Sequence, residues 1–458
     1  MAAERGTVND AAQLQRWIDA ERDRFSRVRP RSQSLAQAAR SHWLNGVPMH
    51  WMQDWGTPFP VFVERAAGAW LEDVDGHRYA DFCLGDTGAM FGHSPAPLRA
   101  ALAQQAAAAL TCMLPDERIV AVGARLTELF GLPCWQISQT ATDANRAALR
   151  WARAATGRDR VLAFAGCYHG TVDETLVELS AGRTAPRRGL IGSPVGNAGS
   201  TTLIEFNDLD ALASELATGT YACVITEPVM TNIGMVLPQR GFHGALRDLT
   251  RRAGTLLLID ETHTLSTGLG GYARVHGLEP DLWVCGKAIA GGFPCAVLGF
   301  TAAMEARMQA VLARRADGHS GMGTTLASNA LAIACLDAAL TALHTPENYE
   351  RMLTTAGRLA QSLVDTFAKH GLPWTVSRVG ARLEFGFGPR APRNGSESAG
   401  QMQPALERAI HLYLLNRGVL LTPFHNMMLC SPATDGEHLA RLTAALDTGL
   451  DDLKVVLA

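Results

Sequence analysis

Short apolar runs alternate with helical patterns from about residue 130 onward. Each run is four or five residues long and consists mainly of Val, Ile, Leu, Ala and aromatic residues. Strands that are buried on both faces of a sheet show such continuous apolar runs, and the stretches between them have the length of crossover helices. The pattern predicts an α/β fold with a mostly parallel sheet, with strands at 161–164, 222–225, 256–259, 282–285 and 296–300.

The chain before this region carries the signals of a hairpin and of a helix. Two extended runs, 69–74 and 77–82, are joined by an Asp-Gly pair at 75–76, which tolerates the positive φ values of a type I′ turn. A Ser-Pro pair at 94–95 then predicts the start of an Ala-rich helix that reaches about residue 109. Ser supplies a capping oxygen, and Pro is pre-set for the first helical turn.

The pattern after about residue 335 predicts a helix at 349–370 and strands near 381–387 and 419–422. Between the two strands, residues 388–400 are rich in Pro, Gly, Arg and Ser, which predicts an exposed and mobile loop. We expect a large domain and a smaller α+β domain, the large one over 101–335 and the smaller one over 1–100 and 336–458.

Composition and charge narrow the classes of function. A chain with 47% hydrophobic and 19% charged residues can form a large core, so disorder is not the default expectation. The formal charge of −3 gives no basic field for nucleic acid or an anionic membrane. The N-terminal region lacks the pattern of a signal or transit peptide, and no stretch has a membrane-spanning apolar length, so we expect a soluble, cytoplasmic protein. The nine cysteines form no C-x-x-C pair, which argues against a zinc site and a disulfide framework; we expect them buried and reduced, and no metal.

Two residues that follow predicted strands carry the candidate chemistry. Asp260 and Lys287 each come after an apolar run and lie 27 positions apart, the length of one crossover unit. Because ligands of open α/β sheets bind at the carboxyl ends of the strands, both side chains are expected in one crevice. An amine and a buried carboxylate suit pyridoxal phosphate (PLP), since the amine can bind its aldehyde and the carboxylate can keep its ring nitrogen protonated. A salt bridge at the sheet edge fits the spacing equally well.

Two further motifs support a cofactor site. Tyr168 lies between glycines at 166 and 170 after another predicted strand, where its ring could stack on a flat ligand. The hydroxyl-rich segment 138–145 leads into a predicted helix at 146–156, whose free N–H groups suit a phosphate. Taken alone, Tyr168 is also typical of a core tyrosine, and the hydroxyls are typical of a plain helix cap.

The chain resembles the class III aminotransferases of PLP fold type I. The resemblance rests on residues 258–262 (LIDET) and 280–294 (PDLWVCGKAIAGGFP), and it extends from about Thr57 to Asp435. It is strongest toward the branch that contains glutamate-1-semialdehyde aminomutase, β-phenylalanine aminotransferase and D-phenylglycine aminotransferase. The resemblance implies that Lys287 is the Schiff-base lysine and the base that moves the proton between substrate and cofactor, and that Asp260 pairs with the pyridine nitrogen.

The same resemblance implies further contacts with the cofactor and with a second copy of the chain. Tyr168 would stack on one ring face and Thr262 would touch the other. Thr325 would reach the phosphate of the neighbouring subunit, which implies a homodimer with shared active sites. The remaining implied cofactor contacts are the phosphate cup of Thr140, Ala141 and Thr142 and a glutamate near the cofactor, Glu227, for which a structural role is equally expected.

Three positions depart from the family pattern or extend it. Ala141 replaces a glycine, which predicts a slightly displaced phosphate loop and weaker cofactor binding. Thr262 replaces a valine and adds a hydroxyl that could contact the cofactor or His263. His263 itself is interpreted as an ordinary exposed residue, in preference to a partner of the site.

The substrate pocket lacks the arginines that clamp a carboxylate in related aminotransferases. The two corresponding segments, 50–55 and 423–427, contain aromatic residues and histidines and no arginine. The aromatic side chains favour a bulky apolar substrate, although they fit packing of the small domain equally well. The candidate substrate contacts are His50, Trp51, Trp55, Arg382, Phe424 and His425, of which Arg382 and His425 are the candidates for a carboxylate contact.

The sequence therefore predicts an aminotransferase with ping-pong kinetics. It would exchange an amino group between a bulky or aromatic amino acid, or an amine, and a keto acid. An aminomutase or racemase on the same scaffold is the first alternative, because the cofactor residues are shared. A non-catalytic protein is the remote alternative, disfavoured by the presence of Lys287, Asp260 and Tyr168.

Overall fold

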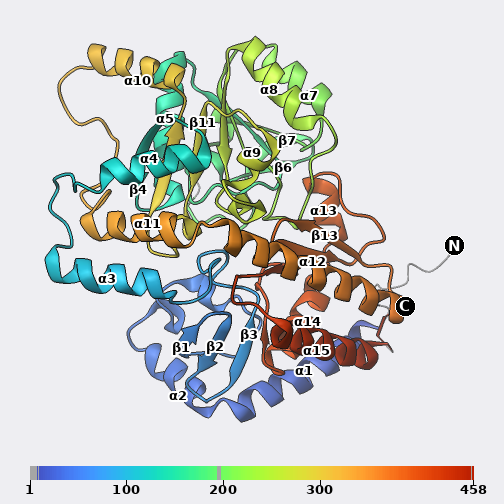
Figure 1. Ribbon diagram of the computed structural model, residues 1–458. Helices are drawn as coiled ribbons and strands as arrows, with labels where there is room; N and C mark the ends of the chain where they lie inside the picture. Colours follow the sequence, from blue (N-terminus) through green and yellow to red (C-terminus); the bar gives the residue numbers. More distant parts are fainter. Residues whose placement is uncertain (1–7, 9, 193–196, 455, 458) are drawn as a thin grey trace. The chain divides into compact units, whose positions relative to one another are not determined.

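The computed structural model describes residues 8, 10–192, 197–454, 456 and 457 (Figure 1). The chain divides into two compact units. Unit 1 comprises the residues up to Pro95, Glu350–Ala391 and the residues from Gln401; unit 2 comprises Ala96–Tyr349 and Pro392–Gly400. The expected domain boundary at residue 335 would cut the helix α11 (Ala330–Ala342), whereas unit 2 extends to Tyr349. The first seven residues of the expected 1–100 segment lie outside the described residues.

Unit 2 is built on a seven-stranded sheet of order β4-β12-β11-β10-β9-β5-β8. The five neighbours from β11 to β8 pair in parallel, and β12 is antiparallel to both β11 and β4. This confirms the predicted α/β class with a mostly parallel sheet. The strands are β4 (Cys134–Ser138), β5 (Arg160–Phe164), β8 (Thr201–Ile204), β9 (Tyr221–Thr226), β10 (Leu256–Asp260), β11 (Leu282–Cys285) and β12 (Ala296–Phe300).

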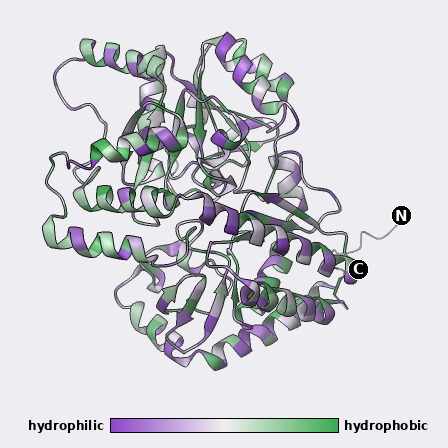
Figure 2. Cartoon of the chain, in the orientation of Figure 1, coloured by the Kyte–Doolittle hydropathy of each residue, from purple (hydrophilic) through white to green (hydrophobic). Residues whose placement is uncertain are grey.

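The central strands of unit 2 are almost continuously apolar and buried, as two covered faces require (Figure 2). Helix α5 packs against β9, β11 and β12. It begins at residue 141, earlier than predicted, because the Thr140 hydroxyl accepts the backbone N–H of Asp143 as its cap. The other elements of unit 2 are α3 (Ala96–Ala108), α4 (Ile119–Phe130), α5 (Ala141–Thr156), α6 (Asn197–Ser200), α7 (Leu209–Leu216), α8 (Phe242–Ala253), α9 (Gly271–His276), α10 (Ala302–Arg314), α11, and the hairpin of β6 (Val177–Ser180) and β7 (Arg183–Pro186).

Unit 1 contains two smaller sheets with helices, an α+β arrangement. One sheet has the order β1-β2-β3-β15 and the other the order β13-β14-β16. The strands are β1 (Val63–Ala67), β2 (Trp70–Asp73), β3 (Arg78–Asp81), β13 (Thr375–Val379), β14 (Arg382–Gly386), β15 (Val419–Leu420) and β16 (Met427–Leu429). The helices are α1 (Ala11–Val28), α2 (Pro30–Ala39), α14 (Pro404–Leu415), α15 (Gly436–Leu453) and most of α12 (Pro346–Lys369).

The predicted hairpin of unit 1 is present, but its turn differs from the expectation. Strands β2 and β3 pair antiparallel, and the Gly76 N–H donates to the Asp73 carbonyl at 3.0 Å. Gly76 has φ +85°, whereas Asp75 keeps a negative φ, so the turn is not of type I′. The Asp75 carboxylate instead accepts the Ser32 N–H at 2.9 Å and so caps the first turn of α2.

The segment predicted as a mobile loop, 388–400, contains the helix α13 (Gly395–Gln401). The polar residues that suggested a loop serve as caps, since the Asn394 side chain accepts the Glu397 N–H at 2.8 Å. Gly395 is buried, and its backbone lies against the carbonyl of Ala165 in unit 2. The prediction of an exposed loop is therefore wrong for the part from residue 395.

Two further expectations concern membranes and cysteines. Within the described parts of the chain, no helix has both the length and the apolar character needed to cross a bilayer. All nine cysteines are free thiols, and seven of them are buried; Cys112 is exposed and Cys134 is partly exposed, which departs from the expectation that all are buried.

Replacing Gly395 tests the packing of α13. In Gly395→Ala the added methyl would overlap the Ala165 carbonyl oxygen. We expect the free energy of unfolding to fall by about 1–3 kcal/mol, the usual cost of overpacking, in urea titrations followed by fluorescence. The matched control is Gly400→Ala in the same helix, where the added methyl meets no atom within 4 Å. Equal stability of the two variants would contradict the packed arrangement.

Candidate active site

Asp260 and Lys287 lie at the carboxyl ends of neighbouring parallel strands. Asp260 is the last residue of β10 and pairs with Val284 of β11, and Lys287 follows the end of β11 by two positions. Lys287 begins the 3-10 helix η5 (Lys287–Ala290) with φ +46°, an uncommon conformation for a side chain with a Cβ. The strand pairing thus brings the two residues to one edge of the sheet, as the sequence predicted.

Asp260 is buried and accepts hydrogen bonds at both carboxylate oxygens. Oδ2 accepts Asn145 Nδ2 at 2.8 Å and contacts His169 Nδ1 at 3.0 Å, while Oδ1 accepts the backbone N–H and hydroxyl of Thr262 at 3.1 and 2.7 Å. Burial alone would raise the pKa of Asp260, but the hydrogen bond and charge of His169, with the bonds from Thr262 and Asn145, lower it below the usual value. Asp260 is therefore held as a carboxylate.

Asn145 and His169 are two residues of this site that the sequence did not single out as functional. Asn145 lies on α5 among buried apolar positions, and a polar residue in such a face is the signal that could have found it. Its Nδ2 also donates to the His169 carbonyl at 3.2 Å, so both residues brace the loop after β5 against Asp260. His169 follows Tyr168 directly, and no feature of its sequence position separates it from an ordinary loop residue.

Thr262 links the two strand ends. Its hydroxyl donates to Asp260 and accepts the Gly286 N–H at 3.3 Å, so it ties the segment after β10 to the residue before Lys287. Gly286 also lies close to α5, because a Cβ placed on it would come within 3.0 Å of the Ala141 Cβ. The methyl group that replaces the family glycine at 141 is thus turned toward Gly286.

His263 does not have the exposed position expected from the sequence. It is buried, with 6% of its surface exposed, and its Nε2 lies 2.8 Å from Lys287 Nζ. The 3-10 helix η4 (Thr264–Thr267) begins immediately after it and all four of its residues are buried, so the chain turns inward at this point. The interpretation of His263 as an ordinary surface residue is wrong.

The expected phosphate residues lie at the N-terminus of α5. Thr140 caps the helix, which is the plain structural role left open above, and Ala141 and Thr142 form its first turn. The Thr142 hydroxyl accepts the Thr171 N–H at 3.1 Å, which fixes the loop after β5 beside the helix start. A helix N-terminus supplies free N–H groups and a positive dipole end, so an anion can be bound here.

Tyr168 lies in the loop after β5 and Glu227 follows β9 directly, and these two strands are neighbours in the sheet. Glu227 is buried and its Oε1 accepts the Tyr168 N–H at 3.3 Å, while the Thr231 hydroxyl donates to Oε2 at 2.5 Å. Burial raises the pKa of Glu227 above its usual value. Glu227 therefore positions the backbone of Tyr168, which matches the structural role considered for it.

Glu261, next to Asp260, is fully buried and serves α9. Its carboxylate accepts the N–H groups of Tyr272 and Ala273 at the helix start, the latter at 2.7 Å, and Trp283 Nε1 at 3.0 Å. Burial raises the pKa of Glu261 to about 7 despite these donors. The two adjacent carboxylates therefore have different roles. Asp260 lies at the sheet edge in the candidate site, and Glu261 stabilises the start of α9 in the core.

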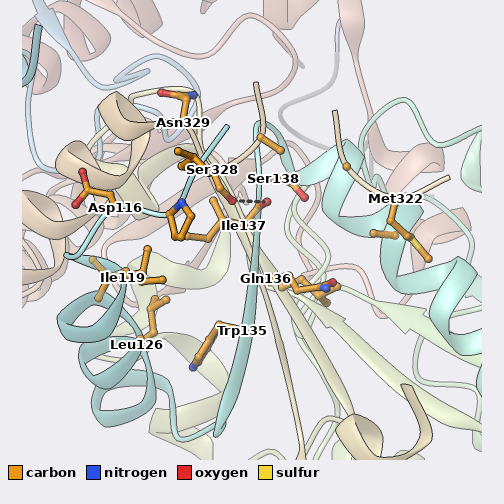
Figure 3. A pocket seen from close by; sticks show the side chains of 18 of the residues that line it. Asp116, Ile119, Leu126, Trp135, Gln136, Ile137, Ser138, Met322, Ser328 and Asn329 are labelled. Carbon is orange, nitrogen blue, oxygen red and sulfur yellow. Dashed lines mark hydrogen bonds between the residues drawn. The ribbon is translucent and has the colours of Figure 1, made fainter. Parts of the chain in front are cut away.

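Thr325 is exposed and lines a cavity of about 1110 Å³ in unit 2. Figure 3 shows side chains of β4, α4 and the 322–329 segment around this cavity, with the Ser328 hydroxyl donating to the Ile137 carbonyl at 3.3 Å. The Thr324 hydroxyl donates to Gln139 Oε1 at 3.0 Å, one residue before the α5 cap. The segment that carries Thr325 is therefore attached near the predicted phosphate cup of its own chain.

The six candidate substrate residues all belong to unit 1. Trp51 and Trp55 line an apolar cavity of about 410 Å³, together with Met52 and Tyr79, among others. His50, Trp51 and Phe424 are exposed. Of the candidate substrate residues, the structure thus brings Trp51 and Trp55 together at one cavity.

The two candidates for a carboxylate contact are buried and engaged within unit 1. Arg382 is fully buried and donates to the Thr87 hydroxyl. His425 lies with Nδ1 2.9 Å from Glu384 Oε1 and has φ +137°. Burial would lower the pKa of His425, but the charge and hydrogen bond of Glu384 raise it above the usual value. The neighbouring Glu384 therefore favours the protonated form of His425.

Comparison with known proteins identifies the family. The model of the class-III aminotransferase family matches residues 51–447. The chain belongs to the class-III aminotransferase family. Membership confirms the fold type predicted from the sequence, and with it PLP as the cofactor.

The relatives of this class-III aminotransferase family member include several aminomutases. A glutamate-1-semialdehyde aminomutase from Pseudomonas aeruginosa PAO1 superposes with a TM-score of 0.95 and 48% identity, covering 97% of this chain and 99% of that one. The glutamate-1-semialdehyde 2,1-aminomutase of Roseiflexus castenholzii is 35% identical over 402 residues, 86% of this chain and 90% of the relative. A β-phenylalanine aminotransferase from Variovorax paradoxus, at 24% identity and a TM-score of 0.86 over 97% of this chain and 99% of that one, shares the fold.

Replacing Glu261 separates its structural role from the chemistry of Asp260. In Glu261→Gln one oxygen becomes an amide NH₂ that faces donors, so we expect a loss of about 1–3 kcal/mol in the free energy of unfolding. The measurement is a denaturant titration at pH 8, above the pKa of about 7, where both carboxylate oxygens accept these donors. The natural protein has by then lost the stability that the raised pKa removes as the pH rises, so a further loss in the variant reports the hydrogen bonds. The control is Glu279→Gln, an exposed carboxylate paired with Arg251, which should change stability by less than about 1 kcal/mol. Similar losses in both variants would contradict the role of Glu261.

Proposed function

We propose that this protein moves an amino group between carbon atoms with PLP held by Lys287 and Asp260. The observation that carries the proposal is the pairing of β10 with β11, which brings a buried carboxylate and an amine to one edge of the sheet. A salt bridge at the sheet edge, the alternative left open by the spacing, does not account for the four hydrogen bonds from other residues that keep the buried Asp260 ionised.

The side chains around Asp260 are compatible with PLP. Beside it, the buried atoms Asn145 Oδ1 and His169 Nε2 have no hydrogen-bond partner within the described part of the chain, so the site retains polar capacity. Asp260 would hold the ring nitrogen in its protonated state. When bound, PLP supplies an electron sink for the carbon that loses a proton.

The other cofactor contacts are proposed by the same reasoning. Tyr168 would cover one face of the ring and Thr262 would contact the other while orienting Asp260. The first turn of α5 at Thr140, Ala141 and Thr142 would bind the phosphate. Lys287 Nζ would bind the aldehyde carbon and, once released from it, would take up and return the proton of the substrate carbon.

A second copy of the chain is the proposed partner. Four apolar residues that line the 1110 Å³ cavity are exposed, namely Met113, Leu114, Ile119 and Val120, and exposed apolar side chains that gather in one place are typical of an interaction surface. A second copy of the chain that covers this surface would bury these side chains. Thr325 of each copy would then approach the phosphate cup of the other copy, so we propose a homodimer with shared active sites. The free cysteines, most of them buried, support a reducing compartment such as the cytoplasm.

The amino transfer is proposed to occur within one substrate molecule. The 48% identity to an aminomutase over nearly the whole chain supports this mode. The second candidate is transfer from an aromatic or bulky donor to a keto acid, which the apolar cavity with Trp51 and Trp55 favours. The other proposed substrate contacts are His50, Arg382, Phe424 and His425. Because Glu384 raises the pKa of His425, its protonated ring would suit a carboxylate.

Lys287→Ala tests the covalent role of the lysine. We expect turnover to fall by at least about 10³-fold while the fold survives, because a half-buried amine contributes little packing. After borohydride reduction, mass spectrometry of peptides should locate the cofactor on Lys287 in the natural protein and find none in the variant. The control is Lys369→Ala, an exposed lysine paired with Asp447, which should keep both properties. Cofactor fixed to another lysine would overturn the assignment.

A substrate assay distinguishes the two modes of transfer. We expect the holoenzyme to convert glutamate-1-semialdehyde into the isomer with the amine on carbon 1 and the carbonyl on carbon 2, without added keto acid. Exchange between an aromatic amino acid and a keto acid, lost in Trp51→Ala, would support the second candidate instead. Loss of optical activity alone would indicate a racemase. A protein that carries PLP on Lys287 but catalyses none of these reactions would contradict the proposal.

A further inference from the structure

The contact between His263 and Lys287 is not explained by any role assigned so far. The two side chains come from the ends of different strands, and their nitrogens lie 2.8 Å apart. His263 is 6% exposed, so its ring is fixed by the surrounding core and does not move freely as a surface side chain would.

Two other histidines of unit 2, the half-buried His243 and the buried His344, show what an ordinary structural histidine does here. His243 Nε2 lies 2.9 Å from the Pro228 carbonyl, and His344 Nε2 lies 3.2 Å from the Ile289 carbonyl. Both rings satisfy backbone oxygens, and burial lowers the pKa of each to about 4. His263 differs because Nε2 faces the side-chain amine on which the proposed chemistry depends.

The segment that carries His263 also holds the carboxylate end of the site. Within residues 260–263, Asp260 accepts the bonds described above, and Thr262 bonds both Asp260 and the Gly286 N–H. His263 then reaches Lys287, the residue after Gly286. One short segment therefore fixes the carboxylate, the turn before the lysine and the amine itself.

The hydrogen bond requires one proton between the two nitrogens. An ammonium at Nζ can donate to a neutral imidazole, and a neutral amine can accept from a ring N–H. In both arrangements the amine is held at one place, and in the first the ring can take the proton that leaves the amine neutral and nucleophilic.

We propose that His263 is a positioning residue for Lys287, which holds Nζ by a shared proton and accepts that proton when the amine acts as a nucleophile or base. The inference rests on the proposed function. It assigns to this chain a histidine that acts through the lysine and does not itself touch the substrate.

The test measures the attachment of PLP to the cofactor-free protein as well as turnover. In His263→Ala we expect attachment, followed by stopped-flow absorbance, to slow by about 10- to 100-fold, because the amine is no longer held in place. For the substrate found active in the assay above, kcat should fall by a similar factor while KM stays within about twofold. His263→Gln should recover the attachment rate, since its amide can still hydrogen-bond with Nζ, but not kcat, since an amide does not take up the proton.

Controls separate this inference from other outcomes. His276→Gln replaces an exposed histidine of α9 and should leave attachment and turnover unchanged. Thermal unfolding checks that the His263 variants remain folded. If His263→Ala does not fold, the comparison is made with His263→Gln alone. If His263→Ala attached PLP at the rate of the natural protein and kept its kcat, or changed in KM alone, the inference would be overturned and the proposed function would remain intact. If the natural protein attaches no PLP at Lys287, the proposed function itself fails.

Discussion

The parallel pairing of β10 and β11 is the constraint on which the candidate site depends. Because Asp260 pairs with Val284, the carboxylate and the start of the Lys287 turn lie at the same level of the sheet. A slip of one residue in β10 would move Asp260 and Glu261 to the opposite faces of the sheet. The ionised carboxylate of Asp260 would then face the core. Both faces of β10 are buried, so such a slip would also leave polar groups in the interior without hydrogen-bond partners. The free-energy cost of those groups fixes the register.

Adjacent carboxylates with opposite pKa shifts show how the same burial serves two purposes. Burial opposes ionisation of both Asp260 and Glu261, yet only Asp260 has a histidine within hydrogen-bond distance. The donors to Glu261 are mostly backbone and indole N–H groups, which stabilise a helix start without supplying a charge. The loop after β5, by contributing His169, therefore decides which carboxylate remains ionised at the sheet edge.

Features set by local pattern were predictable from the sequence, and features set by tertiary contacts were not. The apolar runs identified the strands, and Asp260 and Lys287 were found because they follow those runs directly. The buried position of His263 depends on how η4 turns inward, and no periodicity in the sequence encodes that turn. The segment 388–400 departs from its composition for a related reason. Its composition indicates a loop, but Asn394 caps a helix whose packing requires the small Gly395.

The proposed substrate contact His425 is already engaged in a hydrogen bond with Glu384, which limits how strongly it could bind a substrate carboxylate. Glu384 raises the pKa of His425 and bonds its ring, so a second carboxylate at the ring would compete with or share that interaction. A substrate carboxylate bound there would be neutralised only in part, since Glu384 remains paired with Nδ1. Recognition by His425 would thus be weaker than by a free guanidinium fork. If the apolar cavity of Trp51 and Trp55 receives the substrate, as in the second candidate function, it adds contact area without any charge, and shape would then limit those substrates more than charge.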